Sequence, residues 1–78
     1  GNWDTRSVTN MQAVFNNSFA FNQDIGNWNV SNVTTMRDMF YKSLVFNQDL
    51  SSWNVINVSD YINFSTHTPQ WTLPKPIF

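Results

Sequence analysis

The chain has 78 residues, a formal net charge of −1 and no cysteine, so it can form one small domain without disulfide bonds or a thiolate metal site. Its four basic residues are scattered, which excludes the clustered positive charge of a nucleic-acid-binding surface, and no apolar run approaches the roughly 20 residues that span a membrane. We therefore expect no nucleic-acid partner and no membrane insertion, and the single histidine excludes a multi-histidine metal site.

The sequence repeats itself with a period of 25 residues. Tryptophan occurs at Trp3, Trp28 and Trp53, and the tetrapeptide Phe-Asn-Gln-Asp occurs at 21–24 and again at 46–49. A fixed period of this length is the signature of a solenoid, in which each repeat buries its apolar face against its neighbours.

This period divides the chain into three parts. Residues 3–27 and 28–52 form the first two repeats and are identical at 10 of 25 positions, while residues 53–78 hold a third repeat with a C-terminal cap. We expect residues 1–78 to form a single domain. Because no Phe-Asn-Gln-Asp segment precedes the first tryptophan, we interpret the chain as a C-terminal fragment of a longer repeat array.

The first predicted element of each repeat is a short strand. Ile25, Trp28 and Val30 have the spacing of the leucines in a leucine-rich repeat, and polar residues follow Trp28 and Val30. This alternation predicts a strand with Trp28 and Val30 facing inward. We favour a tryptophan column that fills the core; the alternative is a row of exposed rings that stack on sugars.

A short helix is the next predicted element, because Met36, Met39 and Phe40 recur at i, i+3 and i+4. Residues 46–49 then predict a turn in which Asn and Asp side chains bond to nearby backbone groups. Strand, turn, helix and return define an α/β fold. We expect a short leucine-rich-repeat-like β/α solenoid with three coils of 25 residues and a C-terminal cap.

The predicted cap is the segment 66–78, where the repeat pattern degrades. Pro74 and Pro76 stop helices and strand ladders. The side chains that we expect to cover the last coil are those of Trp71, Leu73, Ile77 and Phe78.

The repeat carries a family resemblance. The phrase Phe-Asn-Gln-Asp-Ile/Leu-x-x-Trp-Asn-Val-Ser-Asn-Val-Thr-x-Met-x-x-Met-Phe is clearest at 21–40 and extends more weakly over residues 2–64. It resembles the BspA-like leucine-rich-repeat variant of bacterial surface proteins and lipoproteins. The resemblance implies an extracellular, cell-surface location and a non-enzymatic role, which in some members is adhesion to host or matrix proteins. The chain itself shows no lipidation signal.

Asp24 and Asp49 are the best candidates for a metal site, because stacked coils would align them and calcium prefers oxygen ligands. One carboxylate per repeat is few for an ion that takes about six to eight oxygens, so we favour bonds to local backbone N–H groups. His67 has no nucleophile or acid that the sequence places beside it. We expect no catalytic residue, no metal and no cofactor.

A binding surface should lie where the copies vary on a fixed scaffold. The outward positions of the predicted strands form such a row, on the face that solenoids generally use for binding. Its members are Asp4, Asn29 and Asn54, then Arg6, Ser31 and Ile56.

The sequence therefore predicts a non-enzymatic protein-interaction or adhesion module that binds a host or matrix protein. One alternative is a spacer or capping segment without its own ligand, and another is a glycan-binding module. We also expect self-association at the open N-terminal coil, because it lacks an upstream neighbour.

Overall fold

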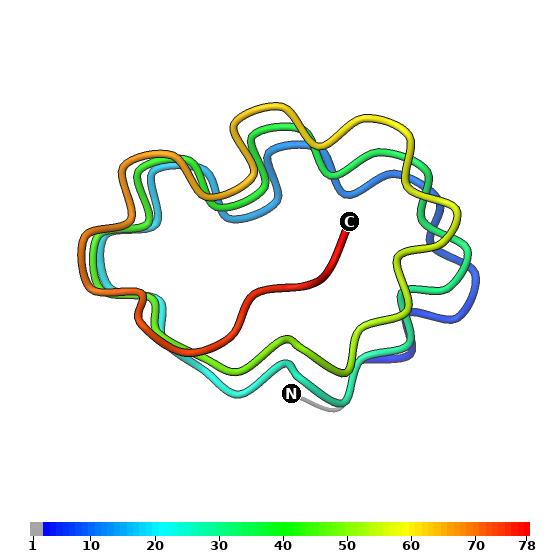
Figure 1. Ribbon diagram of the computed structural model, residues 1–78, viewed down its shortest axis with the longest axis horizontal. Helices are drawn as coiled ribbons and strands as arrows, with labels where there is room; N and C mark the ends of the chain where they lie inside the picture. The colour runs from blue at the N-terminus through cyan, green and yellow to red at the C-terminus, as the bar shows by residue number, and fades with distance from the viewer. Residues whose placement is uncertain (1–2) are drawn as a thin grey trace.

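The structure, a computed structural model, describes residues 3–78. Within this range there is no helix and no extended strand, and the ladder pairs are two isolated parallel bridges, Asn10 with Thr35 and Thr35 with Asp60. The predicted α/β fold, a leucine-rich-repeat-like β/α solenoid of three coils, is therefore wrong. The chain instead follows a wavy closed path, and segments 25 residues apart lie side by side over much of that path (Figure 1).

Backbone hydrogen bonds between neighbouring segments hold this arrangement together. The N–H groups of residues 11, 13, 15 and 17 donate to the carbonyls of residues 35, 37, 39 and 41, at N···O distances of 2.8–3.0 Å. The N–H groups of residues 36, 38, 40 and 42 donate in the same way to residues 60, 62, 64 and 66. Each segment thus donates to the next one, and all the donors are alternate residues.

The predicted helix does not form because its residues make successive tight turns. Asp38 and Lys42 have φ angles of 57° and 59°, in the left-handed region that a right-handed helix excludes. Each of them lies inside a turn whose hydrogen bond spans three residues, from Met39 N to Met36 O at 3.1 Å and from Ser43 N to Phe40 O at 2.9 Å. These are the bonds of β-turns, whereas an α-helix has bonds that span four residues.

The predicted strand is interrupted for a similar reason. One turn closes from Trp28 N to Ile25 O at 3.1 Å, and the next closes from Val33 N to Val30 O at 3.0 Å. Both ends of each turn are buried, while its two central residues lie at the surface or near it. The three-residue spacing of apolar side chains is therefore the spacing of turn ends that point inward.

The core lies inside the closed path and is rich in aromatic rings. Phe40 is fully buried at its centre, with ring centroids 5.4 Å from Phe15, 4.4 Å from Phe46 and 5.1 Å from Trp71. The expectation of a buried tryptophan column holds for Trp28 and Trp53. It fails for Trp3, whose side chain is 70% exposed.

The C-terminal segment leaves the rim and crosses the middle of one face (Figure 1). Its last bond in register runs from Leu50 N to Pro74 O at 2.9 Å. Trp71 is buried, and Phe78 stacks on Tyr61 with ring centroids 4.3 Å apart. Ile77 is 84% exposed, so this residue of the predicted cap covers nothing. No helix long and apolar enough to cross a membrane occurs among residues 3–78.

Candidate interaction face

The six residues predicted as an interaction face lie in equivalent places on neighbouring segments, and we call them the polar row. In each pair a side-chain oxygen accepts the backbone N–H two residues later, which forms an Asx turn. The pairs are Asp4 with Arg6 (3.2 Å), Asn29 with Ser31 (3.0 Å) and Asn54 with Ile56 (3.2 Å). The local backbone at each pair is thus fixed by the side chain that opens the turn.

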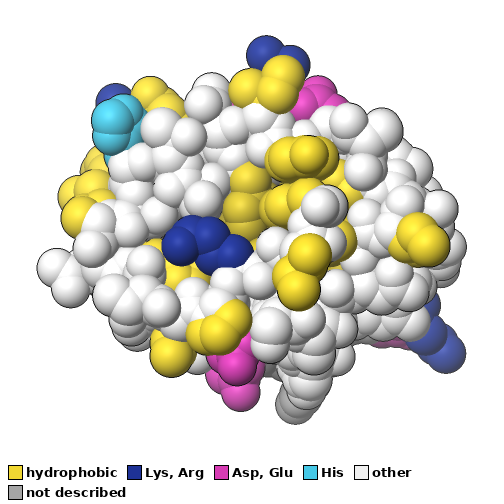
Figure 2. Space-filling model, viewed as in Figure 1, with side chains coloured by type: hydrophobic (Ala, Val, Ile, Leu, Met, Phe, Trp, Pro, Cys, Tyr) yellow, Lys and Arg dark blue, Asp and Glu magenta, His cyan; other side chains and the backbone are white. Residues whose placement is uncertain are grey.

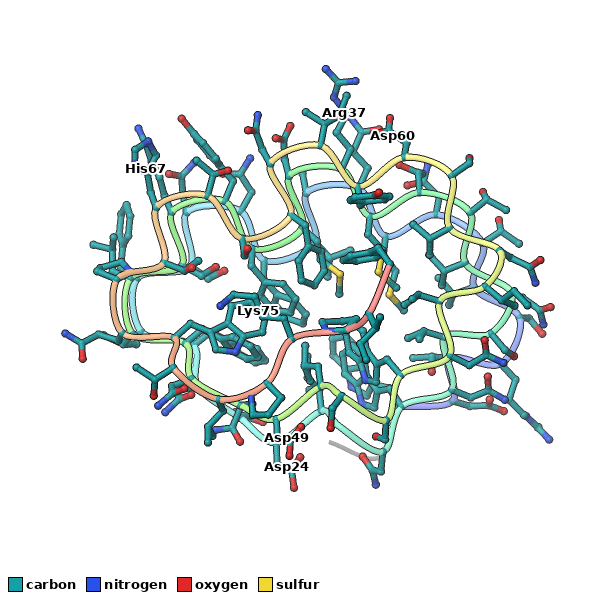
Figure 3. The ribbon with its side chains drawn as sticks, viewed as in Figure 1. Asp24, Arg37, Asp49, Asp60, His67 and Lys75 are labelled. Carbon is teal, nitrogen blue, oxygen red and sulfur yellow. The ribbon has the colours of Figure 1, made fainter. Side chains whose placement is uncertain are left out.

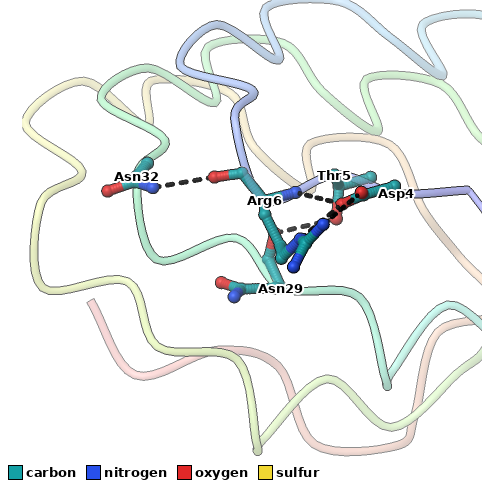
Figure 4. Close-up of polar contacts among 5 residues, drawn as sticks. All are labelled: Asp4, Thr5, Arg6, Asn29 and Asn32. Carbon is teal, nitrogen blue, oxygen red and sulfur yellow. Dashed lines mark hydrogen bonds and ion pairs between the residues drawn. The ribbon is translucent and has the colours of Figure 1, made fainter.

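Three side chains that the sequence prediction missed connect the polar row to the neighbouring segments. Asn32 Nδ2 donates to Arg6 O at 2.7 Å, and Asn57 Nδ2 donates to Ser31 O at 2.7 Å. The hydroxyl of Thr5 donates to Asn29 O at 2.8 Å (Figure 4). The recurrence of asparagine at positions 32 and 57, one period apart, was the available signal for the first two.

Charge is confined to the first pair of the polar row. Arg6 Nη2 lies 2.8 Å from Asp4 Oδ2, and both side chains are mostly exposed (Figure 4). The hydrogen bond from the guanidinium, with that from the Arg6 backbone, lowers the pKa of Asp4 below its usual value. The same side-chain contact raises the pKa of Arg6. The pair is therefore ionised throughout the neutral range.

The polar row changes in chemistry from one segment to the next. It begins with the Asp4–Arg6 ion pair, continues with the amide of Asn29 and the hydroxyl of Ser31, and ends at Ile56, which is 82% exposed. The row thus offers a charged, a polar and an apolar contact at fixed spacing.

A hollow of about 290 Å³ adjoins the first pair of the row. It is lined by the aromatic rings of Trp3 and Trp28, which stack with centroids 5.6 Å apart, and by polar side chains that include Asn27. Trp28 Nε1 is buried there without a hydrogen-bond partner among residues 3–78. The equivalent Trp53 Nε1 donates to Ile25 O at 3.1 Å, so the indole of Trp28 lacks a contact that the next copy makes.

The two aspartates considered for calcium accept local hydrogen bonds instead. Asp24 Oδ1 accepts the N–H of Gly26 at 3.0 Å, and Asp49 Oδ1 accepts the N–H of Ser51 at 2.9 Å and its hydroxyl at 2.6 Å. Both point outward on the rim (Figure 3). Among residues 3–78, no three acidic or histidine side chains gather into a group that could hold a metal ion.

Two asparagines near these aspartates, and His67 on the opposite side of the molecule, make contacts within the chain (Figure 3). Asn22 Oδ1 accepts the N–H of Asn47 at 2.8 Å, and Asn47 Oδ1 accepts the N–H of Thr72 at 2.9 Å, so these asparagines connect successive segments. In both bonds the acceptor is a side-chain oxygen and the donor is a backbone N–H group of the next segment. The ring of His67 packs edge-on against Tyr41, with centroids 5.6 Å apart.

Comparison with known proteins places the chain in a family. Residues 1–72 match the family model described as "Mycoplasma protein of unknown function, DUF285". No curated protein and no solved structure shows a significant match. Since the match covers nearly the whole sequence with its 25-residue period, the chain belongs to the family of Mycoplasma proteins of unknown function, DUF285.

Proposed function

We propose that the chain is a non-enzymatic protein-interaction or adhesion module of a bacterial surface protein, and that its partner is a host or matrix protein. The observation that carries the proposal is the polar row, in which exposed side chains repeat on neighbouring segments. The resemblance of the repeat to BspA-like surface proteins supports the extracellular location. We further propose that the chain also associates with itself through its N-terminal edge.

The geometry of the polar row favours binding because its backbone is already ordered before a partner docks. The Asx turns and the bonds from Asn32 and Asn57 already fix the backbone at each pair. A surface that is ordered before binding loses less conformational entropy when a partner docks. Arg6 and Ile56, at the two ends, are of the residue kinds that can anchor a partner by charge and by apolar contact.

The test is binding of the 78-residue chain to immobilised fibronectin, laminin and collagen, measured by biolayer interferometry. We expect saturable binding to at least one of them, and a loss of about tenfold or more in the double variant Arg6→Ala/Ile56→Ser. Gln70→Ala, at an exposed position outside the row, is the matched control and should bind as the wild type does. Equal affinity of the double variant and the wild type would show that the polar row is not the binding surface.

A glycan-binding role is the second candidate, and the exposed ring of Trp3 favours it. This ring borders the hollow of about 290 Å³ together with Asp4, Arg6 and Asn29, and aromatic faces beside polar groups suit sugar rings. A glycan array probed with the wild type and with Trp3→Ala tests this role. Signals that disappear in Trp3→Ala would favour it, and an array without signals would reject it. If the matrix proteins also fail to bind, the remaining proposal is a spacer or capping segment without its own ligand.

A further inference from the structure

Among residues 3–78, the hydrogen-bonded arrangement leaves one edge on each face whose backbone groups have no partner. Toward the N-terminal side, the carbonyls of residues 10, 12, 14 and 16 occupy the places that residues 35, 37, 39 and 41 occupy one period later. Those later carbonyls accept hydrogen bonds, whereas these four accept none from residues 3–78. We call residues 9–17 the acceptor edge.

The opposite side has the complementary set of groups. The N–H groups of residues 61, 63, 65 and 67 are the counterparts of the donors at residues 36, 38, 40 and 42, and they have no acceptor among residues 3–78. We call residues 59–67 the donor edge. The C-terminal segment crosses the middle of this face, but the donor edge runs along its rim (Figure 1).

The chemistry of the edges decides which faces can meet. Two acceptor edges cannot bond to each other, because both present carbonyls, and two donor edges present only N–H groups at these positions. A donor edge and an acceptor edge, in contrast, match group for group at the 25-residue register. Thr9 N and Ser59 O add a fifth pair in the opposite direction, as Ser59 N and Thr34 O already pair within the chain at 2.9 Å.

Exposed apolar side chains on both faces would gain cover in the same contact. Trp3 and Val14 are exposed on the first segment, while their counterparts Trp28 and Met39 are buried, and Tyr61 and Phe78 are exposed at the other end. Figure 2 shows hydrophobic side chains gathered on the face that the C-terminal segment crosses. A hollow of about 200 Å³ is lined by Phe64, Phe78 and neighbouring residues. Phe64 is the counterpart of Val14 in the 25-residue register, so the hollow can receive Val14 of the next molecule.

We infer that a second copy of this chain docks head to tail, with its acceptor edge on the donor edge of the first. The contact extends the self-association part of the proposed function by naming both surfaces. It is heterologous, so it repeats into an open linear assembly and does not close as a symmetric dimer. Each face is roughly elliptical, with axes of 28 and 25 Å. Two such faces in contact bury on the order of 1,100 Å² in total, which is near the lower limit for a specific interface. The assembly is therefore weak and depends on concentration.

Disulfide trapping tests the register, because the chain has no cysteine of its own. In a head-to-tail contact Ile62 of one copy lies beside Gln12 of the next, just as Arg37 lies beside Gln12 within the chain. Adjacent residues on paired backbones lie about 5 Å apart, within the range that a disulfide spans. The experiment mixes the variants Ile62→Cys and Gln12→Cys, and follows mixed disulfides under mild oxidation by mass spectrometry.

Three controls accompany the mixture. The double variant Gln12→Cys/Arg37→Cys should form an internal disulfide and shows that the geometry permits one. Gln12→Cys alone reports a contact between two acceptor edges. Gln70→Cys mixed with Gln12→Cys reports random collision, because Gln70 is exposed at another register position.

We expect the 62–12 disulfide to form about tenfold faster than the 70–12 and 12–12 disulfides, since docking holds the thiols at a high effective concentration. We also expect the mass in sedimentation equilibrium to rise with concentration beyond that of a dimer. Equal rates for all three pairs, or a single-chain mass up to the millimolar range, would overturn the inference. Binding to matrix proteins is a separate readout on the polar row, so either proposal can fail while the other stands.

Discussion

Among residues 3–78, six residues other than glycine have a left-handed backbone, and their positions follow the 25-residue period. One set is Ala13, Asp38 and Asn63, with φ angles of 57–59°, and the other is Asn17, Lys42 and His67, with φ angles of 57–60°. The asparagines, the aspartate and the histidine are of the kinds found most often in this conformation after glycine, whereas Ala13 and Lys42 are not. The chain therefore carries backbone strain at defined places, which a single substitution can relieve.

Ala13→Gly should raise the free energy of unfolding by about 1 kcal/mol, because glycine loses the steric penalty of the left-handed region. The exposed Ala13 gives up only a methyl group. Urea unfolding followed by tryptophan fluorescence measures the change. The control is Gln12→Gly, at the preceding exposed residue without a positive φ, and it should lower the stability. The same sign in both variants would contradict the backbone assignment.

The Asx turn at Asp49 leads us to expect that the stability of the fold decreases at low pH. Hydrogen bonds from the Ser51 hydroxyl, and then from its backbone N–H, lower the pKa of Asp49 in the folded chain. A carboxyl with a lowered folded pKa stabilises the fold above its ordinary pKa, and this contribution is lost as the pH falls through the folded value. The urea midpoint should therefore decline below about pH 4.

Ser51→Ala should move the pKa of Asp49 back toward its ordinary value, and an NMR titration of the side-chain carboxyl measures it. Asp49→Asn keeps an oxygen that accepts the Ser51 N–H but cannot titrate, so it should flatten the acid limb of the stability curve. An unchanged Asp49 titration in Ser51→Ala would refute this role of the hydroxyl.

At the scale of the elements, the β-turn replaces both the strand and the helix that the sequence predicts. The apolar spacing that indicates a helix at Met36, Met39 and Phe40 arises because turns begin and end at these residues. A helix and a chain of turns both place residues three apart on one face, so periodicity alone cannot separate them. The left-handed backbone at Asp38 and Lys42 distinguishes the turns from a helix. Neither residue is glycine, so the sequence gives no strong turn signal there.

The aromatic packing inside the turns should account for much of the stability. Phe40→Ala removes a fully buried ring that contacts rings of all the neighbouring segments, and we expect a loss of about 3–5 kcal/mol. Phe19→Ala is the matched control, since Phe19 is 60% exposed, and its effect should stay within about 0.5 kcal/mol. Chemical unfolding measures both, and similar effects in the two variants would argue against this core.

At the scale of the whole molecule, the sequence predicts the 25-residue period that the structure follows, while the strands on which it places the polar row do not form. Its identical tetrapeptides and tryptophans mark positions that lie side by side. The connections by Thr5, Asn32 and Asn57 could not be predicted, because they depend on which backbone carbonyl faces each side chain. Trp3 shares the spacing of the buried Trp28 and Trp53 but is itself 70% exposed, so the spacing alone does not predict burial at this position.

Removal of residues 69–78 should lower the melting temperature sharply or prevent folding. The deletion takes away Trp71, which packs against Phe40 and Phe46, and it also exposes Tyr61 and Phe64. Near-ultraviolet circular dichroism follows the loss of fixed aromatic packing. A shortened chain that melts at the same temperature would show that this segment does not cover the core.

Amide hydrogen exchange measured by NMR on the dilute 78-residue chain tests the central claim, the in-register stack of turns. The N–H groups of Met36, Asp38 and Phe40 should exchange slowly, because they donate to the next segment. Their counterparts Tyr61 and Asn63 should exchange fast, because no acceptor among residues 3–78 faces them. Equal protection in the two sets, as a helix in each repeat would give, would contradict the stack and the open edges that follow from it.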